Sequence, residues 1–298
     1  MQQHVVNTTL NYYLSPAQGG TTIYQPGAVS DKRRPHDVQK VHVTDIRGRE
    51  DEFKLDKQGF QIIQLATSVQ DVEKDADWKG EYFEDIMEQV KKITGASRAK
   101  SVSHMARRKD FNQVMAAEKD MDDNQAVTAP TYNRAVHVDQ SYDHARNILS
   151  AQFPDEAEKI AQKRWALVNV WRPLVNTVTR DNLALCDARS VDDSELVPLK
   201  GDIPQPGKSS RPNGWNWTSK SKSIELWAVN ANAEAHRWYY CSKLTPQEGI
   251  LFKQFDSKRT GVAKRTPHTA FVCDEDEGPT RQSVEARMLL VWDNQTND

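Results

Sequence analysis

The chain has 298 residues, of which 37% are hydrophobic and 28% charged, and its formal net charge is −2. A chain of this length can bury a sizeable core, and we expect a single domain spanning residues 1–298. The lysines and arginines form no basic tract, so nucleic acid is not an expected partner.

The N-terminus and the cysteines bear on where the protein resides. The segment MQQHVVNTTLNYYL lacks the basic stretch and apolar run of a signal peptide. No apolar stretch approaches the roughly 20 residues that span a bilayer, so a membrane is not an expected partner either. The three cysteines, Cys186, Cys241 and Cys273, are odd in number and widely spaced, which indicates free thiols in a reducing compartment. We therefore expect a cytoplasmic protein.

The predicted elements begin with residues 1–40, a stretch rich in Gly, Pro, Thr and Gln that we expect to form an N-terminal arm. Such an arm can exchange between two copies of a chain, which is compatible with a homodimer without requiring one. Apolar residues three or four apart predict a helix at 69–94, and capping signals predict helices beginning near Ser141 and Pro154. Strands are expected at 41–48, 53–65, 99–104, 164–174, 223–229, 236–243, 249–257, 269–274 and 284–292.

A composition shift marks residues 196–222, which are rich in Gly, Pro, Ser, Lys and Asn. We expect a long loop there, and Trp215 and Trp217 in NGWNW favour a lid over an apolar substrate. Helices are expected early and most strands late in the chain. This order predicts a mainly β fold, a sandwich or barrel of strands flanked by helices.

The stretch YNRAVHVDQSYDHARN places His137 and Asp139 two positions apart. On a strand, residues at this spacing point to the same side, so the two side chains could bind one metal ion together. On its own, the pattern is better explained by a hydrogen-bonded pair at the end of a strand.

The segment RTPHTAFVCDEDEGPTRQSVEARMLLVW changes this balance, because it adds His268 and, thirteen residues later, Arg281 followed by Ser283. A guanidinium and a hydroxyl on one strand face suit a carboxylate. Two histidines and one carboxylate are the facial triad of non-haem Fe(II) oxygenases. We therefore predict that His137, Asp139 and His268 bind Fe(II), with open positions for 2-oxoglutarate and O₂. Arg281 and Ser283 would hold the far carboxylate of 2-oxoglutarate.

Other residues compete for these roles. His236 is an alternative metal ligand, although no Arg-x-Ser follows it, and Arg287 is the rival to Arg281 as the carboxylate clamp. On the strand at 164–174, Trp171 and Arg172 face opposite ways, and Asn169 either bonds 2-oxoglutarate or substrate or is a buried core residue. The weaker candidates for the substrate pocket are Asn169, Trp171, Arg172, His236 and Trp215.

Six stretches resemble one known family, in the same order from about Asp45 to Trp292: DIRGREDEFKLDKQGFQ, VNVWRPL, LALCDARSV, HRWYYCSKLTPQEGILFKQFDSK, TPHTAF and RQSVEARMLLVW. They are similar to the fungal gibberellin desaturase-like family, which includes hydroxylase/desaturases of secondary-metabolite clusters. The resemblance implies a double-stranded β-helix core (jelly roll, cupin-like) and an Fe(II)/2-oxoglutarate-dependent dioxygenase. It also implies the same iron ligands and the same clamp residues.

The expected reaction is oxidation of an unactivated C–H bond in a small, largely apolar polycyclic, polyketide or terpenoid metabolite. Hydroxylation, desaturation, endoperoxide formation and rearrangement all stay open as its outcome. Two alternatives also stay open. One is a jelly-roll binding or structural protein with a vestigial metal site, and the other is a metal-dependent isomerase or hydrolase that does not use 2-oxoglutarate.

Overall fold

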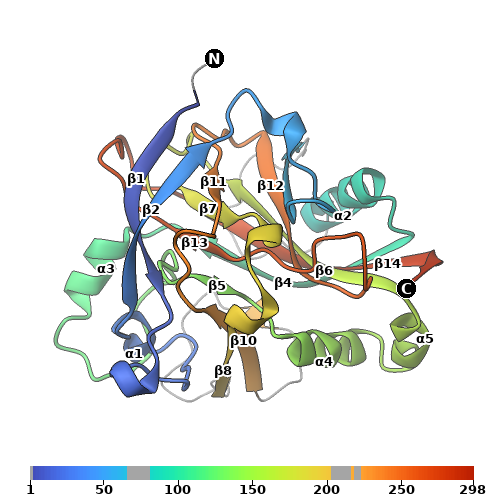
Figure 1. Cartoon of the computed structure of the whole chain (residues 1–298), viewed down its shortest axis with the longest axis horizontal. Helices are drawn as coiled ribbons and strands as arrows, with labels where there is room; N and C mark the ends of the chain where they lie inside the picture. The colour runs from blue at the N-terminus through green and yellow to red at the C-terminus, as the bar shows by residue number, and fades with distance from the viewer. Residues whose placement is uncertain (1–2, 66–80, 203–215, 218–222) are drawn as a thin grey trace.

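Two β-sheets dominate the computed structural model, which describes residues 3–65, 81–202, 216–217 and 223–298 (Figure 1). The first sheet has the strand order β1 (Val5–Tyr12), β2 (Asp37–Asp45), β11 (Trp238–Tyr240), β7 (Leu183–Cys186), β13 (His268–Ala270), β5 (His137–Val138), β10 (Ser223–Val229) and β8 (Leu196–Asp202). The second has the order β3 (Phe60–Gln64), β12 (Glu248–Asp256), β6 (Lys163–Pro173), β14 (Ser283–Thr296), β4 (Arg98–Arg107) and β9 (Asn216–Trp217). Neighbouring strands pair antiparallel in both sheets, apart from the parallel pair β2 and β11.

The two sheets pack face to face, and large apolar side chains fill the space between them. Trp171 of β6 and Phe252 of β12 belong to one buried cluster with Leu183 and Leu185 of β7. Each fully buried side chain of this size contributes roughly 1.5–3 kcal/mol relative to exposure. The burial of β12 along its whole length shows that its second face is covered too. The expected jelly-roll core is confirmed.

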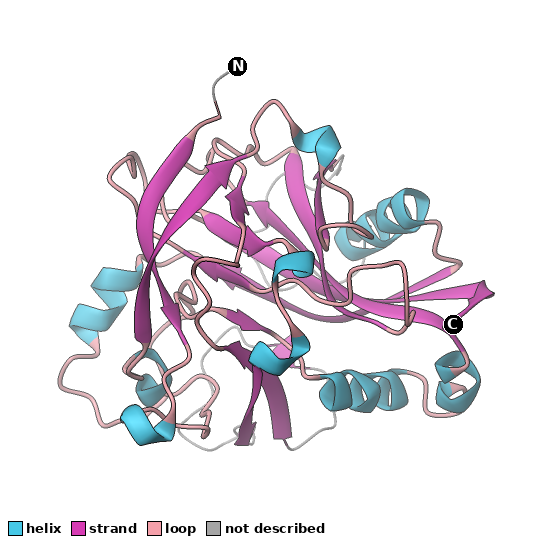
Figure 2. Cartoon of the chain, viewed as in Figure 1, coloured by secondary structure: helices cyan, strands magenta, loops and turns pink. Residues whose placement is uncertain are grey.

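Helices cover the outside of the second sheet (Figure 2). The helix α2 (Glu81–Thr94) buries Tyr82, Ile86 and Val90, which lie four residues apart on one face, against the core that β6 and β14 form. It ends at Gly95, whose φ of 71° suits the left-handed residue that follows a helix. The shorter helices are α1 (Val29–Lys32), α3 (Phe111–Ala117), α4 (Tyr142–Gln152) and α5 (Ala157–Ala161).

Several sequence-based boundaries differ from the structure. The helix expected at 69–94 is described only from Glu81, because residues 66–80 lie outside the described part of the chain. The helix α4 does begin after Ser141, whose side chain accepts a hydrogen bond from the His144 backbone N–H. The helix expected from Pro154 begins only at Ala157.

The loop expected at 196–222 begins instead with strand β8. Leu199 of this strand is buried against Tyr13 and Leu226, and this burial outweighs the Pro and Gly content of the segment. Pro198 is tolerated because β8 is the edge strand of its sheet, where a missing backbone N–H disrupts less pairing. Trp215 and most of the expected lid lie outside the described residues.

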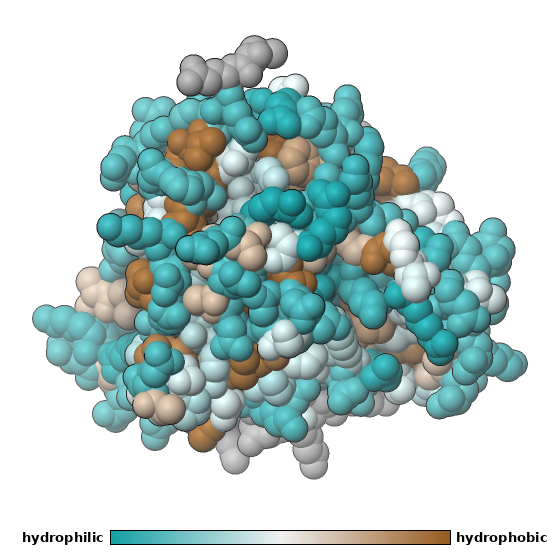
Figure 3. All heavy atoms as spheres, viewed as in Figure 1, coloured by the Kyte–Doolittle hydropathy of each residue, from teal (hydrophilic) through white to brown (hydrophobic). Residues whose placement is uncertain are grey.

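The mainly hydrophilic surface and the free cysteines are those expected from the amino-acid sequence. Hydrophilic residues dominate the face in Figure 3, and hydrophobic residues occupy separate small areas of it. None of the described helices combines the length and the apolar character that crossing a membrane requires. Cys186, Cys241 and Cys273 are free, as expected.

Candidate metal centre and its cavity

His137 and His268, 131 positions apart in the sequence, are direct cross-strand partners. Strand β5 pairs with β13, and in this register His137 lies opposite His268. Directly opposite residues of an antiparallel pair project to the same face, so both imidazoles point the same way. Their ring centroids are 4.4 Å apart. Strand pairing therefore brings the two histidines together despite their separation in the sequence.

Asp139 completes the group, since it follows His137 by two positions and shares its side of the chain. Its Oδ1 lies 3.3 Å from Nε2 of His137, and its Oδ2 lies 3.9 Å from Nε2 of His268. One ligand atom from each of the three residues falls within 4.8 Å of the others. Within the described residues, this is the one group of three or more His, Cys, Asp or Glu side chains arranged so closely.

Backbone carbonyls orient both imidazoles. Nδ1 of His137 donates to the carbonyl of Ala135 over 2.8 Å, and Nδ1 of His268 donates to the carbonyl of Thr266 over 3.0 Å. A hydrogen bond at Nδ1 leaves the lone pair of Nε2 free to bind a metal and fixes the plane of the ring. Both Nε2 atoms face the Asp139 carboxylate. The arrangement is that of a histidine pair set up to coordinate through Nε2.

The surroundings favour the ligand forms of Asp139 and His268 but not that of His137. Burial by itself would raise the pKa of Asp139, but the nearby Arg287 and the hydrogen bond with His137 hold it well below its usual range. Burial and the neighbouring His137 lower the pKa of His268 to about 3. Burial also acts to lower the pKa of His137, but Asp139 more than offsets this and raises it. An ionised carboxylate beside two imidazoles fits a divalent transition metal such as Fe(II).

Three further side chains hold Asp139. Nδ2 of Asn169 donates to Oδ2 of Asp139 over 2.7 Å, and a terminal nitrogen of Arg287 forms an ion pair with the same oxygen over 2.8 Å. Nε of Arg287 donates to the amide oxygen of Asn169 over 3.2 Å. The backbone N–H of Asp139 donates to the side chain of Gln254 over 2.9 Å. Asn169 therefore contacts the proposed metal ligand directly.

Arg281 and Ser283 continue the strand face that carries Arg287. The Arg281 guanidinium lies 4.0 Å above the ring of Tyr132 and 5.4 Å from that of Trp171, and it donates to the backbone carbonyl of Asp181. Burial lowers its pKa to about 10. Its Nε and the Ser283 hydroxyl are buried without a hydrogen-bond partner in the described part of the chain. Buried donors left unpaired are costly, which is a reason to expect an anionic ligand beside them.

The remaining sequence-based candidates lie elsewhere. Arg172 faces the outside of its sheet, 5.5 Å from the ring of Tyr82, whereas Trp171 packs in the core between the sheets. His236 is buried between Tyr12, 3.0 Å from Nδ1, and Glu195, 3.2 Å from Nε2. It does not line the cavity that His137 and Asp139 line, and neither do His268, Arg281 and Ser283. Trp215 lies outside the described residues.

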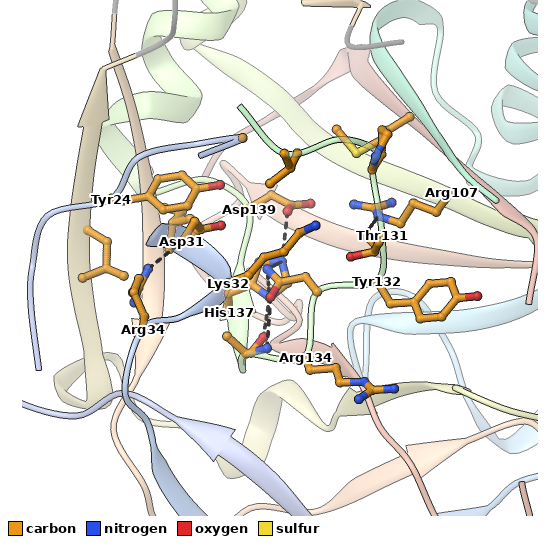
Figure 4. A pocket seen from close by; sticks show the side chains of 18 of the residues that line it. Tyr24, Asp31, Lys32, Arg34, Arg107, Thr131, Tyr132, Arg134, His137 and Asp139 are labelled. Atoms are coloured by element: carbon orange, nitrogen blue, oxygen red, sulfur yellow. Dashed lines mark hydrogen bonds and ion pairs between the residues drawn. The ribbon is translucent and has the colours of Figure 1, made fainter. Parts of the chain in front are cut away.

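A cavity of about 410 Å³ opens beside His137 and Asp139. The N-terminal arm forms one wall, and Tyr24 and Asp31 lie across from Asp139 in Figure 4. Apolar side chains of β10, Ile224 and Leu226, line it too. Every Lys or Arg that lines the cavity has a carboxylate within 4.0 Å: Lys32 with Glu118, Arg34 with Asp31, Arg107 with Glu285, Arg134 with Asp181, and Arg287 with Asp139.

Tyr24, Asp31 and Glu285 also line the cavity, and none of them was predicted from the sequence. Glu285 lies between Ser283 and Arg287 on one strand face, so the alternation of β14 was a signal that could have found it. Burial and the nearby Asp139 raise the pKa of Glu285. Tyr24 and Asp31 carried no such signal, because only the folded path of the arm brings them to the cavity.

Several known proteins are similar to this chain over most of its length. A family model described as "Oxidoreductase/YMDC permease-like domain" matches residues 10–291. Hydroxylase/desaturase efuI of Hormonema carpetanum is 38% identical over 100% of this chain and 99% of its own length. The alpha-ketoglutarate-dependent dioxygenase phiK of a fungal species is 31% identical over 98% of both chains. The chain belongs to this fungal family of hydroxylase/desaturases and Fe(II)/2-oxoglutarate-dependent dioxygenases.

Two further matches bear on the resemblance and on the fold. The gibberellin cluster GA4 desaturase of Gibberella fujikuroi is 26% identical over 96% of both chains, which confirms the resemblance found in the sequence motifs. A solved structure of the iron and alpha-ketoglutarate-dependent endoperoxidase NvfI superposes with a TM-score of 0.76. It covers 98% of this chain and 99% of its own, at 22% identity. The dioxygenase family and this chain therefore share one fold.

Proposed function

We propose that this protein is an Fe(II)/2-oxoglutarate-dependent dioxygenase that oxidises an unactivated C–H bond of a fungal secondary metabolite. The observation that carries the proposal is the convergence of His137, Asp139 and His268 at one end of a cavity, with ligand atoms within 4.8 Å of one another. The membership of the chain in a family of hydroxylase/desaturases and dioxygenases supports the same chemistry.

In this proposal the chain's own residues hold and orient the reactants. His137, Asp139 and His268 would hold Fe(II) through two imidazoles and one carboxylate. Arg281 and Ser283, with donors not used inside the protein, take the far carboxylate of 2-oxoglutarate. Bound Fe(II) would supply the activation of O₂, coupled to decarboxylation of 2-oxoglutarate to succinate. The cavity walls place one C–H bond of the substrate near the metal and exclude bulk water.

The cavity also indicates the kind of substrate. Its volume falls within the range of about 300–1,000 Å³ typical of small-molecule sites. Because each lining Lys and Arg already faces a carboxylate, the wall has no unpaired charge to recognise an anionic group. A neutral substrate with an apolar skeleton and a few hydroxyl or carbonyl groups fits best, in keeping with a terpenoid, meroterpenoid or polyketide. We further propose a cytoplasmic location, and a homodimer through the N-terminal arm is compatible with the fold.

The test begins without a substrate. The protein is mixed with Fe(II) and 2-oxoglutarate in the absence of O₂, and the weak visible charge-transfer band of the chelate is recorded. We expect the band in the wild type and its loss in His137→Ala. Admission of O₂ should then yield succinate, slowly alone and faster with a true substrate. No metal uptake would instead support a binding or structural protein, and substrate turnover without 2-oxoglutarate or O₂ would support an isomerase or hydrolase.

A further inference from the structure

We infer that Arg287 and Asn169 form a positioning pair that holds Asp139 as a one-oxygen ligand, and that Arg287 does not bind the co-substrate. The inference rests on the proposed function and deepens it. It assigns a role to two residues that the sequence left as candidates for binding 2-oxoglutarate or substrate.

The geometry is a closed ring of two hydrogen bonds and one ion pair. Asn169 and Arg287 lie directly opposite each other on β6 and β14. Nδ2 of Asn169 donates to Oδ2 of Asp139 over 2.7 Å, and a terminal nitrogen of Arg287 forms an ion pair with the same oxygen over 2.8 Å. Arg287 also donates from Nε to the amide oxygen of Asn169 over 3.2 Å, which fixes the orientation of that amide. Asn169 is fully buried and Arg287 is 9% exposed, so water competes little for these bonds.

The two oxygens of Asp139 are therefore not equivalent. Oδ2 accepts a hydrogen bond from Asn169 and forms an ion pair with Arg287, whereas Oδ1 faces Nε2 of His137 at 3.3 Å. An oxygen occupied by two donors is a poor metal ligand, so Oδ1 is the oxygen left for the metal. A carboxylate that binds through one oxygen keeps a coordination position free, and a bidentate co-substrate needs two positions besides the one for O₂.

The second sheet, which carries Asn169 and Arg287, also holds the backbone of Asp139. The pairing of β12 with β6 shifts between Lys253 and Phe255, and Gln254 lies unpaired in this irregularity. Its side chain accepts the Asp139 backbone N–H over 2.9 Å. Irregularities of this kind often redirect a side chain next to an active site. Asp139 follows the short strand β5 of the first sheet, but its carboxylate and its N–H are both held by the second sheet.

The same contacts separate the roles of the two arginines. Arg287 uses its Nε and a terminal nitrogen inside the protein, on Asn169 and Asp139. Arg281 makes one hydrogen bond, to the carbonyl of Asp181, and its Nε has no partner. Arg281 therefore keeps donors for a carboxylate, whereas Nε and one terminal nitrogen of Arg287 are already engaged with Asn169 and Asp139.

The experiment measures metal binding without turnover. Metal-free wild type, Asn169→Leu, Arg287→Met and Arg287→Lys are titrated with Mn(II), and free Mn(II) is followed by electron paramagnetic resonance. Loss of an outer hydrogen-bond partner of a metal ligand costs about 10–100-fold in metal affinity, and we expect this loss in the first two variants. Arg287→Lys retains one charged donor and should recover part of it. The double variant should lose less than the product of the single losses, because the two residues act on one oxygen.

A second measurement excludes a merely structural role. Co(II) is bound to each variant at saturation, and its visible spectrum reports the coordination number. We expect a change of spectrum in Arg287→Met and Asn169→Leu, because the freed Oδ2 can reach the metal. Thermal unfolding of the metal-free proteins shows whether each variant is folded. If Arg287→Met unfolds, Arg287→Lys and Asn169→Leu still decide the question.

The matched control is Arg281→Met, which should bind Mn(II) within about threefold of the wild type and lose affinity for 2-oxoglutarate. The opposite pattern, with Mn(II) affinity retained in Arg287→Met and 2-oxoglutarate binding lost there, would make Arg287 the clamp and overturn the inference. Unchanged Mn(II) affinity and Co(II) spectra in both Asn169→Leu and Arg287→Met would also overturn it. If the wild type itself bound no metal, the proposed function would fail as well, so the two failures are distinguishable.

Discussion

Two clusters of buried charge share strands β6 and β12, and they differ in how completely their polar atoms are paired. In the first cluster, Lys253 uses its ammonium group on Asp56, Asp256 and the carbonyl of Ala263, over 2.6, 2.6 and 3.0 Å. Arg164 binds Asp56 and Asp256 as well, over 2.6 and 2.8 Å. In the second cluster, Nε of Arg281, the hydroxyl of Ser283 and Nε2 of Gln254 are buried with no hydrogen-bond partner among the described residues.

This difference distinguishes a cluster that stabilises the fold from one that is available to bind a ligand. A buried network whose charges and donors satisfy one another leaves nothing for a ligand, and its role is to hold the strands together. A buried site with unpaired donors stores an energetic cost that a bound ligand can relieve. The predictions that follow test this contrast. Changes in the paired cluster should affect stability alone, and changes in the unpaired cluster should affect binding alone.

The largest expected effect is on metal binding. His137→Ala and His268→Ala should each weaken Mn(II) binding by well over the roughly 100-fold that the loss of an outer partner costs, because a ligand itself is removed. His236→Ala should leave Mn(II) affinity unchanged while lowering the melting temperature, since His236 bonds Tyr12 and Glu195. Titration of the metal-free proteins measures both. Loss of metal in His236→Ala with retention in His268→Ala would move the third ligand to His236.

The next effect is on stability in the paired cluster. Lys253→Met removes a fully buried cation and leaves the buried Asp256 with Arg164 as its remaining cationic partner, so the free energy of unfolding should fall by up to about 3–5 kcal/mol. Urea unfolding measures the change, and Mn(II) affinity should stay at the wild-type value. The control is Lys119→Met, a change at an exposed residue, which should alter stability by less than about 0.5 kcal/mol. A loss of metal affinity without loss of stability in Lys253→Met would contradict the contrast.

Arg281→Met should show the reverse behaviour. Hydrogen bonds to charged groups are each worth about 1.5–3 kcal/mol, so affinity of the metal-loaded protein for 2-oxoglutarate should fall roughly 10- to 150-fold. The unliganded protein should be no less stable, because the substitution removes a buried charge that carries an unpaired donor. Calorimetric titration in the absence of O₂ measures the affinity. Arg189→Met, at a half-exposed arginine, serves as the control, and equal losses in both variants would refute the clamp.

Ser283→Ala should have a smaller effect of the same kind. One neutral hydroxyl contributes about 0.5–1.5 kcal/mol, which corresponds to a roughly 2- to 13-fold loss of 2-oxoglutarate affinity. Because the hydroxyl has no partner in the unliganded protein, the melting temperature should not fall. A clear drop in melting temperature with unchanged 2-oxoglutarate affinity would make Ser283 a packing residue.

The smallest expected effect is on how the free energy of unfolding depends on pH, through Asp56 of the paired cluster. Burial would raise the pKa of Asp56, but Lys253 and Arg164 outweigh this and lower it below its ordinary value. A carboxyl whose pKa is lower in the folded state stabilises the fold above its unfolded pKa of about 3.9, and this contribution is lost as the pH falls through the folded value. Since Asp56 is about half exposed, we expect less than about 1 kcal/mol. Urea unfolding from pH 6 to pH 3 should show a shallower loss in Asp56→Asn than in the wild type.

The metal centre could be predicted from sequence only in part. The spacing of His137 and Asp139 placed them on one side of a strand, but the third ligand depended on the pairing of β5 with β13, which no local pattern specifies. The choice of His268 over His236 came from the Arg-x-Ser that follows it and from the resemblance. The sequence left Asn169 open between binding 2-oxoglutarate or substrate and a buried core role, and its contact with Asp139 depends on the fold, in which it lies opposite Arg287 on β14.

The fold shows the same division between local and long-range information. Alternation and capping located β6, β14 and α4, whose signals lie within their own residues. Strand β8 was missed because Pro198 and Gly201 suggested a loop, and only burial of Leu199 against distant partners makes it a strand. The wall formed by Tyr24 and Asp31 was missed for a similar reason, since the path of the arm depends on the rest of the protein.

The pairing of His137 with His268 also bears on how the protein matures. A chain that is still being synthesised can form His137 and Asp139 long before His268 exists, so a partly made chain has only two of the three ligands. The complete site arises when β13 is placed between β5 and β7, which requires most of the first sheet to be in place. Metal that binds only this complete arrangement shifts the folding equilibrium towards the native state. Under the proposed ligand set, folding intermediates that lack β13 would offer two of the three ligands and would hold the metal less tightly than the native protein.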